Sequence, residues 1–263
     1  MFILGSVRFF FFLPIPLNAA FTPSLRVLPW LQECSLQLVQ VHDPVGFDAF
    51  HVQGLWMDDK YVYFTSVRRL GLEGWIFKVD RKGAAETAKR NVAKGWDLHP
   101  GGIDYDGHRL WVPVAMYKKH SHTHVLSLDP ETLTERLEFE VDDHIGALAC
   151  HQGQVVGANW DAETFYFWNL EGTLLQKRGN PTGVAYQDIK AMDGYLACVG
   201  GEVLDWIKID SWTLAKRYEL KESSAQGHPM GREGVAILDD TVFFLPDDGP
   251  GCRLYEFQLQ KNE

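Results

Sequence analysis

The stretch from Ile145 to Arg178, IGALACHQGQVVGANWDAETFYFWNLEGTLLQKR, decides the fold of this chain. It divides into four short segments of strand-forming residues, at 145–150, 154–159, 164–169 and 174–178. The Gln-Gly pair between the first two segments supplies the positive φ that a tight hairpin turn needs. Helical periodicity is not sustained anywhere in the chain. The stretch therefore predicts one four-stranded antiparallel sheet.

The same pattern returns along most of the chain. An alternating strand that ends in Asp, Asn or Gln recurs every 40 to 49 residues, as Ile76–Asp80, Val125–Asp129, Phe165–Asn169, Trp206–Asp210 and Leu254–Gln258. A period of about 45 residues with three or four short strands per repeat is typical of propeller blades. The sequence predicts an all-β fold, a five-bladed β-propeller. A six-bladed propeller is the alternative, and it would need shorter blades.

The two ends of the repeat array complement each other. The last repeat has only three strands before the chain ends at Glu263, and Leu36–Asp43 (LQLVQVHD) has no partner of its own. Pairing these segments would complete the last blade and remove the open edge of the ring. We therefore expect a single propeller domain over residues 34–263, closed by its N-terminal strand.

Residues 1–33 are expected to form a signal-like or poorly ordered segment. Basic residues are few before the apolar run Phe9–Leu17, which resembles the core of a signal peptide. Pro14 and Pro16 interrupt this run, so a stable membrane-spanning helix is not expected. If the segment is a signal peptide, the protein is secreted or directed to the endoplasmic reticulum; otherwise it is cytoplasmic.

Composition narrows the class of function. The 263 residues include 25 Lys and Arg against 35 Asp and Glu, a formal net charge of −10, and no basic block offsets it. A nucleic-acid partner is therefore not expected. The four cysteines are widely spaced, which excludes a zinc ribbon and a disulfide-stapled miniprotein. The kinds of partner that the composition still allows are a small-molecule ligand and another protein.

The predicted topology places the functional candidates at the mouth of the central channel. Loops that enter inner strands share one face with loops that join second and third strands, and such loops commonly carry function. Three of the five entrances carry a histidine, a suitable general base. We predict His99, His144 and Glu233 as catalytic groups, and as ligand-binding groups His51, Gln53, Tyr186, Gln187, Asp188, Arg232 and Trp160.

Metal binding is considered at two places. His51, His99, His144 and Asp188 could hold a divalent ion, Ca or Zn, although polar residues also line wet channels without any ion. His120, His122 and His124 in KKHSHTHV alternate, so their rings would share one face of an extended segment and could chelate zinc. No further metal-ligating residue near these histidines in the sequence would complete a zinc coordination shell. The alternative interpretation is a solvated loop.

Five short motifs carry a family resemblance: HPGGIDYDG at 99–107, LWVPVA at 110–115, DHIG at 143–146, YQD at 186–188 and PDDG at 246–249. Together they resemble an uncharacterised β-propeller family of bacteria and fungi that is known only as a domain of unknown function. The match extends over most of residues 36–260. The resemblance implies a propeller and supplies no reaction.

A looser resemblance points to the plant-type glutaminyl cyclases, which are also five-bladed. Val52–Leu55 (VQGL) resembles their FTQGL segment, and Tyr63–Val67 (YFTSV) falls where they carry FESTG. Their glutamate in that segment corresponds here to Thr65. A cyclase-type reaction would therefore need Glu233 or a channel histidine in its place.

Two hypotheses follow from these patterns. The first is a propeller that binds or transforms a small molecule at the channel mouth, by hydrolase, lactonase or cyclase-type chemistry with or without a metal ion. The alternative is a non-enzymatic scaffold that presents its loops to a protein partner. Polar groups that converge within hydrogen-bonding distance would favour the first hypothesis, and a flat ring of scattered groups would favour the second.

Overall fold

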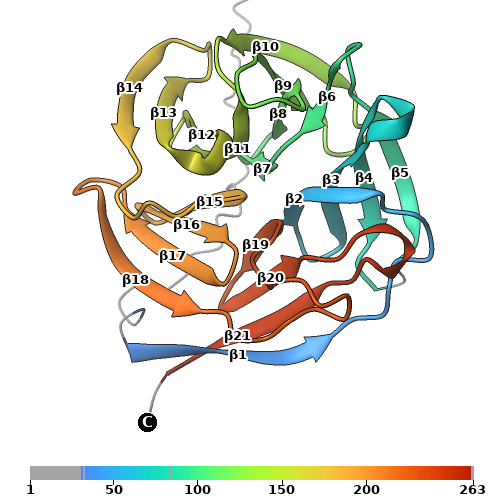
Figure 1. The fold of residues 1–263 in the computed structure, drawn as a ribbon, viewed down its shortest axis with the longest axis vertical. Helices are drawn as coiled ribbons and strands as arrows, with labels where there is room; N and C mark the ends of the chain where they lie inside the picture. The colour runs from blue at the N-terminus through green and yellow to red at the C-terminus, as the bar shows by residue number, and fades with distance from the viewer. Residues whose placement is uncertain (1–30, 32, 83, 262–263) are drawn as a thin grey trace, which may run out of the picture.

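Five antiparallel sheets surround a central axis in the computed structural model, which describes residues 31, 33–82 and 84–261 (Figure 1). The predicted five-bladed propeller is confirmed, and the six-bladed alternative is wrong. The signal-like segment predicted for residues 1–33 lies outside the described residues, apart from positions 31 and 33. Within the described ranges, no helix has the length and apolar character needed to cross a bilayer.

Each blade is a sheet of four main strands that runs from the axis to the rim. Blade 1 contains β2 (His51–Met57), β3 (Tyr61–Arg68), β4 (Glu73–Asp80) and β5 (Glu86–Asn91). Blade 2 contains β6 (Asp97–Pro100), the short β7 (Asp104–Tyr105), β8 (Leu110–Met116), β9 (Thr123–Leu128) and β10 (Glu135–Val141). Blade 3 contains β11 (Ile145–His151), β12 (Gln154–Asn159), β13 (Thr164–Asn169) and β14 (Leu174–Gly179).

The remaining blades follow the same plan. Blade 4 contains β15 (Asp188–Met192), β16 (Tyr195–Gly200), β17 (Val203–Lys208) and β18 (Thr213–Glu219). Blade 5 contains β19 (Gly234–Leu238), β20 (Thr241–Leu245), β21 (Tyr255–Lys261) and β1 (Cys34–Val41). In the described chain after β1, three short 3-10 turns lie in loops: η2 (Arg69–Gly71), η3 (Trp160–Ala162) and η4 (Gly249–Gly251).

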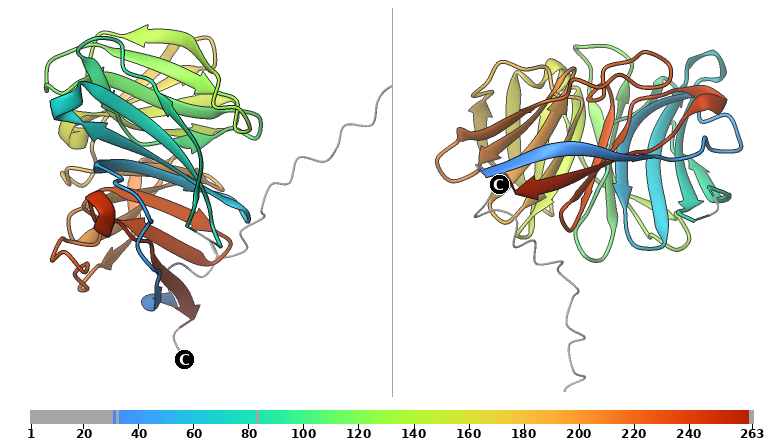
Figure 2. Two further views of the ribbon diagram at one scale, coloured as in Figure 1. Left: turned by 90° about the vertical axis from the view of Figure 1, so that its right-hand side faces the viewer. Right: turned by 90° about the horizontal axis from the view of Figure 1, so that it is seen from below.

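Blade 5 joins the two ends of the described chain. Strand β1 pairs antiparallel with β21, with Leu38 opposite Phe257, and both views in Figures 1 and 2 show the two strands side by side. The predicted closing strand is therefore confirmed, although it begins at Cys34 rather than Leu36. Leu36 and Leu38 pack against the apolar cluster between blades 4 and 5. Closure gives blade 5 its fourth, outer strand, so the edge of β21 is paired.

The core consists of apolar layers between neighbouring blades, because successive side chains of a strand point to opposite faces of its sheet. In blade 2, Val112 and Val114 pack toward blade 1, whereas Trp111 and Val125 pack toward blade 3. Such burial contributes about 25 cal/mol per Å² of apolar surface. The side chains between blades are therefore the main source of stability of the ring.

Candidate functional site at the channel mouth

Side chains from four of the five blades meet at one end of the central channel. They come from β2 and β6, from the loop between β8 and β9, from the residue before β11, from η3, and from the segments that flank β19 and β20; they are His51, Gln53, His99, Tyr117, His144, Trp160, Arg232, Glu233 and Asp248. All are held in place by strand ends or by short loops of the ring. The geometry separates them into two polar clusters.

The first cluster is a chain of three buried side chains. The amide nitrogen of Gln53 donates to the carbonyl of Val52 at 2.8 Å, which turns its Oε1 toward His99. His99 Nε2 lies 2.7 Å from that oxygen and donates to it, so His99 Nδ1 accepts from His144 Nε2 at 3.1 Å. The partners thus assign one tautomer to His99.

The far end of this chain has two partners. His144 Nδ1 lies 3.3 Å from the Ser121 hydroxyl and 3.0 Å from the carbonyl oxygen of Lys118. A neutral His144 accepts from Ser121, and a protonated His144 donates to Lys118 instead. The chain can therefore take up a proton without losing its other hydrogen bonds.

Both imidazoles of the chain are neutral at neutral pH. Burial lowers the pKa of His99 well below 6.5, and the neighbouring His144, His51 and Arg69 lower it further. Burial also lowers the pKa of His144, although the carbonyl groups of Lys118 and Met116 oppose this effect. Neutral rings can orient a ligand or accept a proton.

The second cluster alternates nitrogen-bearing side chains, His51 and Arg232, with carboxyl groups, Asp248 and Glu233. His51 Nδ1 lies 3.2 Å from Asp248 Oδ1, and Arg232 Nη2 lies 2.9 Å from Asp248 Oδ2. His51 Nε2 lies 3.9 Å from Glu233 Oε1, and Arg232 Nε lies 3.4 Å from the same oxygen. Asp248 therefore fixes the His51 ring with Nε2 directed toward Glu233 and the mouth, the arrangement of a histidine base held by a carboxylate.

The two carboxyl groups of this cluster have opposite pKa shifts. Burial raises the pKa of Glu233 well above 4.5, and the Arg232 guanidinium offsets this only in part. Burial also raises that of Asp248, but hydrogen bonds from His51 and Arg232 outweigh it and lower the pKa of Asp248 overall. A carboxyl group with a raised pKa beside an ionised one is the pattern of an acid paired with a charge-stabilising group.

Tyr117 links the two clusters. Its hydroxyl lies 3.5 Å from His51 Nε2, and its ring centroid lies 4.5 Å from that of His99 and 5.9 Å from that of Trp160. The Arg69 guanidinium lies 4.4 Å from the Tyr117 ring centroid. Tyr117 is not among the predicted site residues; it directly follows β8, at the start of a loop that joins second and third strands.

Blade 4 contributes differently from what the sequence predicts. Asp188 is fully buried, and its carboxylate accepts from Lys190 Nζ and from backbone amides of two other blades. Tyr186 is buried and donates to Asp205 of β17 at 2.5 Å, whereas Gln187 is exposed. These three residues do not join the two clusters at the mouth.

Thr65 occupies a structural position. Its hydroxyl accepts from the amide of Gly54 at 2.8 Å and donates to the carbonyl of Gly101 at 2.6 Å. The side chain is completely buried. Thr65 thus links blade 1 to blade 2, and its hydroxyl offers no acid or base.

One group in the described part of the chain brings three metal-ligating atoms within 4.8 Å of one another: Asp97, His122 and His124. This group could hold a metal ion. The four residues predicted for a metal, His51, His99, His144 and Asp188, form no such group among the described residues. Asp97 was missed because it lies 25 residues before His122, on another strand.

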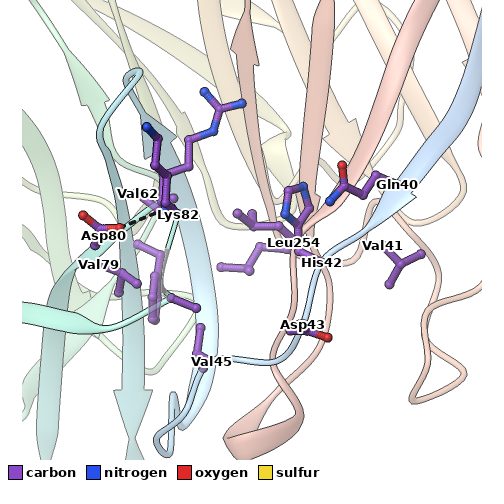
Figure 3. Close-up of a pocket in the computed structure, with 14 residues that line it drawn as sticks. Gln40, Val41, His42, Asp43, Val45, Val62, Val79, Asp80, Lys82 and Leu254 are labelled. Carbon is purple, nitrogen blue, oxygen red and sulfur yellow. Dashed lines mark hydrogen bonds between the residues drawn. The ribbon is translucent and has the colours of Figure 1, made fainter.

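A separate groove of about 300 Å³ lies at the side of the ring, between blades 5 and 1 (Figure 3). It is lined by residues 40–43 of the chain, by the ends of β3 and β4, and by Leu254. The predicted site residues do not line it. The groove is therefore distinct from the channel mouth.

Comparison with known proteins agrees with the fold. A glutaminyl cyclase from Myxococcus xanthus is similar over 88% of this chain and 98% of its own, with a TM-score of 0.63 and 14% identity. A luciferin-regenerating enzyme is similar over 88% of this chain and 97% of its own, with a TM-score of 0.55 and 10% identity. At these identities the similarity shows a shared fold.

Sequence comparison supplies the family. No curated protein shows significant similarity to the chain. The model of the family of unknown function DUF6454 matches residues 31–191, more than half of the chain and including the HPGG and DHIG motifs. The protein is therefore a propeller that belongs to the family of unknown function DUF6454.

Proposed function

We propose that the channel mouth binds a small polar molecule with a carboxylate or carbonyl group and transforms it by acid–base chemistry of the hydrolase or cyclase type. The observation that carries this proposal is convergence. The hydrogen-bonded Gln53–His99–His144 chain and the His51–Asp248 pair both contact Tyr117: its ring packs 4.5 Å from that of His99, and its hydroxyl lies 3.5 Å from His51 Nε2. A scattered ring of polar groups would not require such contacts. The enzymes among the structural neighbours are consistent with this class.

Each group has a role that follows from its surroundings. His51, oriented by Asp248, acts as general base through Nε2, and Glu233 acts as the proton donor because its pKa is raised. His99 and His144 form the polar floor under the ligand and can take up a proton through their chain. Under these assignments Glu233 keeps its predicted catalytic role, His51, predicted as a ligand-binding group, becomes the base, and His99 and His144 support the ligand.

Binding is assigned to the rim of the mouth. The Arg69 guanidinium is exposed, and no described carboxylate lies within ion-pair distance of it, so it is available to a ligand carboxylate. Tyr117 and Trp160 offer ring faces to the apolar part of a ligand. Arg232 forms an ion pair with Asp248 and donates to the carbonyl of Pro246. Its guanidinium therefore holds the second cluster together and is only partly available to a ligand.

The test is a turnover assay with a glutaminyl dipeptide, a γ-lactone and an acyl ester. We expect the wild type to convert at least one of them, and Glu233→Gln or His51→Gln to lower kcat about 100-fold or more, as loss of a general acid or base does. The control is Glu171→Gln, an exposed acidic residue in the turn between β13 and β14. Full activity in both site variants, or no turnover of any compound by the wild type, contradicts the proposal.

One observation favours the scaffold function as a second candidate. Leu70, in η2, is fully exposed (103%), and Trp96, directly before β6, is 67% exposed. Both lie on loops of the mouth face, where a contiguous apolar patch would mark a contact surface. Replacing both with Ser should leave turnover unchanged if they serve a protein partner, and a loss of turnover would assign them to the small-molecule site instead.

A further inference from the structure

We propose that Asp97, His122 and His124 bind a zinc ion that fastens the β8–β9 loop to blade 2. Both His122 Nε2 and His124 Nε2 lie 3.1 Å from Asp97 Oδ2. Zinc bonds of about 2.0–2.1 Å place tetrahedral ligands about 3.4 Å apart, so the donor atoms already have nearly the required spacing. Only small side-chain adjustments separate this group from a three-ligand site.

Strand register explains why these three side chains share one face. On β8, Met116 lies opposite Asp97 of β6, and Val114 lies opposite His124 of β9. Met116 and Val114 are two residues apart, so they project from the same face, and their partners follow them. His122 is two residues from His124 and joins that face at the start of β9. The alternating histidines therefore meet a carboxylate from the far side of β8.

His124 has more acceptors around its ring than a neutral imidazole has N–H groups to donate, which points to a cation at this position. Its Nδ1 lies 3.0 Å from Glu140 Oε1 while its Nε2 lies 3.1 Å from Asp97 Oδ2, so the ring stands between two carboxylates. A neutral imidazole has one N–H and can satisfy only one of them. When the single N–H is at Nδ1, on the Glu140 side of the ring, the Nε2 lone pair faces Asp97, and a metal ion between Nε2 and Asp97 would satisfy both. A carboxylate behind a ligating histidine is the usual support of such a ligand.

Asp97 supplies a second, independent observation. Its Oδ1 is buried and makes no hydrogen bond within the described part of the chain. A buried carboxylate oxygen without a partner is costly, and coordination of an ion by this carboxylate would remove that cost. Two imidazoles with one carboxylate suit zinc, whereas calcium takes six to eight oxygen ligands. Three protein ligands leave the fourth position to water.

The ion would also position the channel mouth. His122 ends the loop that contains Tyr117 and Lys118, and these two residues contact His99 and His144. Zinc at His122 would hold this loop and thereby the wall of the mouth. This consequence rests on the proposed function; zinc binding itself does not.

The experiment measures zinc binding to the full chain without any ligand of the mouth. Metal-free protein is given one equivalent of Zn²⁺, desalted and analysed for metal content, and its thermal melt is compared with and without zinc. We expect one zinc per chain and a higher Tm. His122→Ala, His124→Ala and Asp97→Asn should each weaken binding at least tenfold. The matched control is His120→Ala, which removes an exposed histidine of the same loop and should bind zinc like the wild type.

Further readouts keep the outcome clear. Co²⁺ in place of zinc should give the visible absorption of a tetrahedral site in wild type and His120→Ala, and circular dichroism shows whether each variant is folded. His51→Gln should still bind zinc, which separates this proposal from the proposed function. A wild type that retains no zinc, or an equal loss of zinc in His120→Ala, overturns the assignment.

Discussion

At the scale of single residues, buried carboxylates hold the inner strands together. Asp188 Oδ2 accepts from the amides of Leu55 and Val235 at 3.0 and 3.1 Å, and its Oδ1 accepts from Lys190 Nζ at 2.6 Å. Those amides belong to β2 and β19, so one side chain of blade 4 forms hydrogen bonds with both blade 1 and blade 5. A buried backbone amide without a hydrogen-bond partner costs about 1–3 kcal/mol. Asp188 provides the acceptor for both amides, which explains why an acidic residue stands at the axis.

A second buried carboxylate, Asp104, makes stability depend on pH. Burial raises its pKa from 3.8 to about 7, although the Lys190 ammonium and the amide of Cys150 oppose the shift. The native state therefore holds this proton more tightly than the unfolded chain does. The resulting stabilisation is complete below about pH 4 and is lost as the pH rises through 7.

We expect Asp104→Asn to remove this dependence. The stability of the wild type relative to the variant should fall between pH 4 and pH 8, by on the order of 4 kcal/mol for a shift of this size. Urea unfolding at a series of pH values measures the difference. A difference that stays constant over this range, or that grows as the pH rises, contradicts the expectation.

At the scale of elements, the inner strands approach so closely that only glycine fits at their crossings. A Cβ atom on Gly101, directly after β6, would lie 1.9 Å from the carbonyl oxygen of Gly146 in β11. The same approach allows the amide of Gly102 to donate to Gly146 at 2.9 Å. The HPGG motif thus sets the spacing between blades 2 and 3, and His99 at its start is placed at the mouth by that spacing.

Gly101→Ala should therefore destabilise the ring strongly. Overpacking of a filled interior costs about 1–3 kcal/mol, and here the clash is with backbone that cannot rotate away, so we expect the upper part of that range. At roughly 2–4 °C per kcal/mol, Tm should fall by about 5–10 °C. Gly179→Ala in β14 is the control, because nothing lies within 4 Å of its added Cβ. Equal melting temperatures for the two variants would refute this account.

At the scale of the whole molecule, the ring depends on a contact between the two ends of the described chain. The β1–β21 pairing completes blade 5, and Figure 2 shows β1 running along the outside of the ring beside β21. Without β1, the edge of β21 and the apolar surface under Leu36 would face solvent. Exposed strand edges pair with other chains, so closure also protects against aggregation.

Leu36→Asp should weaken this closure, because it places a charge where Leu36 packs against the cluster of blades 4 and 5. We expect a loss of about 2 kcal/mol and a fall of roughly 4–8 °C in Tm. Gln37→Asp is the control, since Gln37 is exposed on the opposite face of β1. Thermal melts of both variants decide the matter, and a Gln37→Asp variant as unstable as Leu36→Asp would count against the closure.

The sequence predicted the ring well and the site in part. The repeat period, the turn residues and the unpartnered N-terminal strand follow from local chemistry, so blade number and closure could be predicted. His51, His99, His144 and Glu233 were placed at one mouth by topology alone. Tyr117, by contrast, could not be ranked above its neighbours, because only the fold shows that its ring stands between the two clusters.

The amino-acid sequence by itself determined the number of blades, their strand order and the end of the ring where loops gather, since alternation and turn chemistry are local properties. Only the tertiary structure decided which polar side chains serve the interior and which face a ligand. Asp188 forms hydrogen bonds between blades at the axis, and Asp97 lies within hydrogen-bonding distance of His122 and His124 on the other side of β8. The reason is distance: hydrogen bonds and metal ligation act over about 3 Å, and residues far apart in sequence reach that range only when the ring is closed.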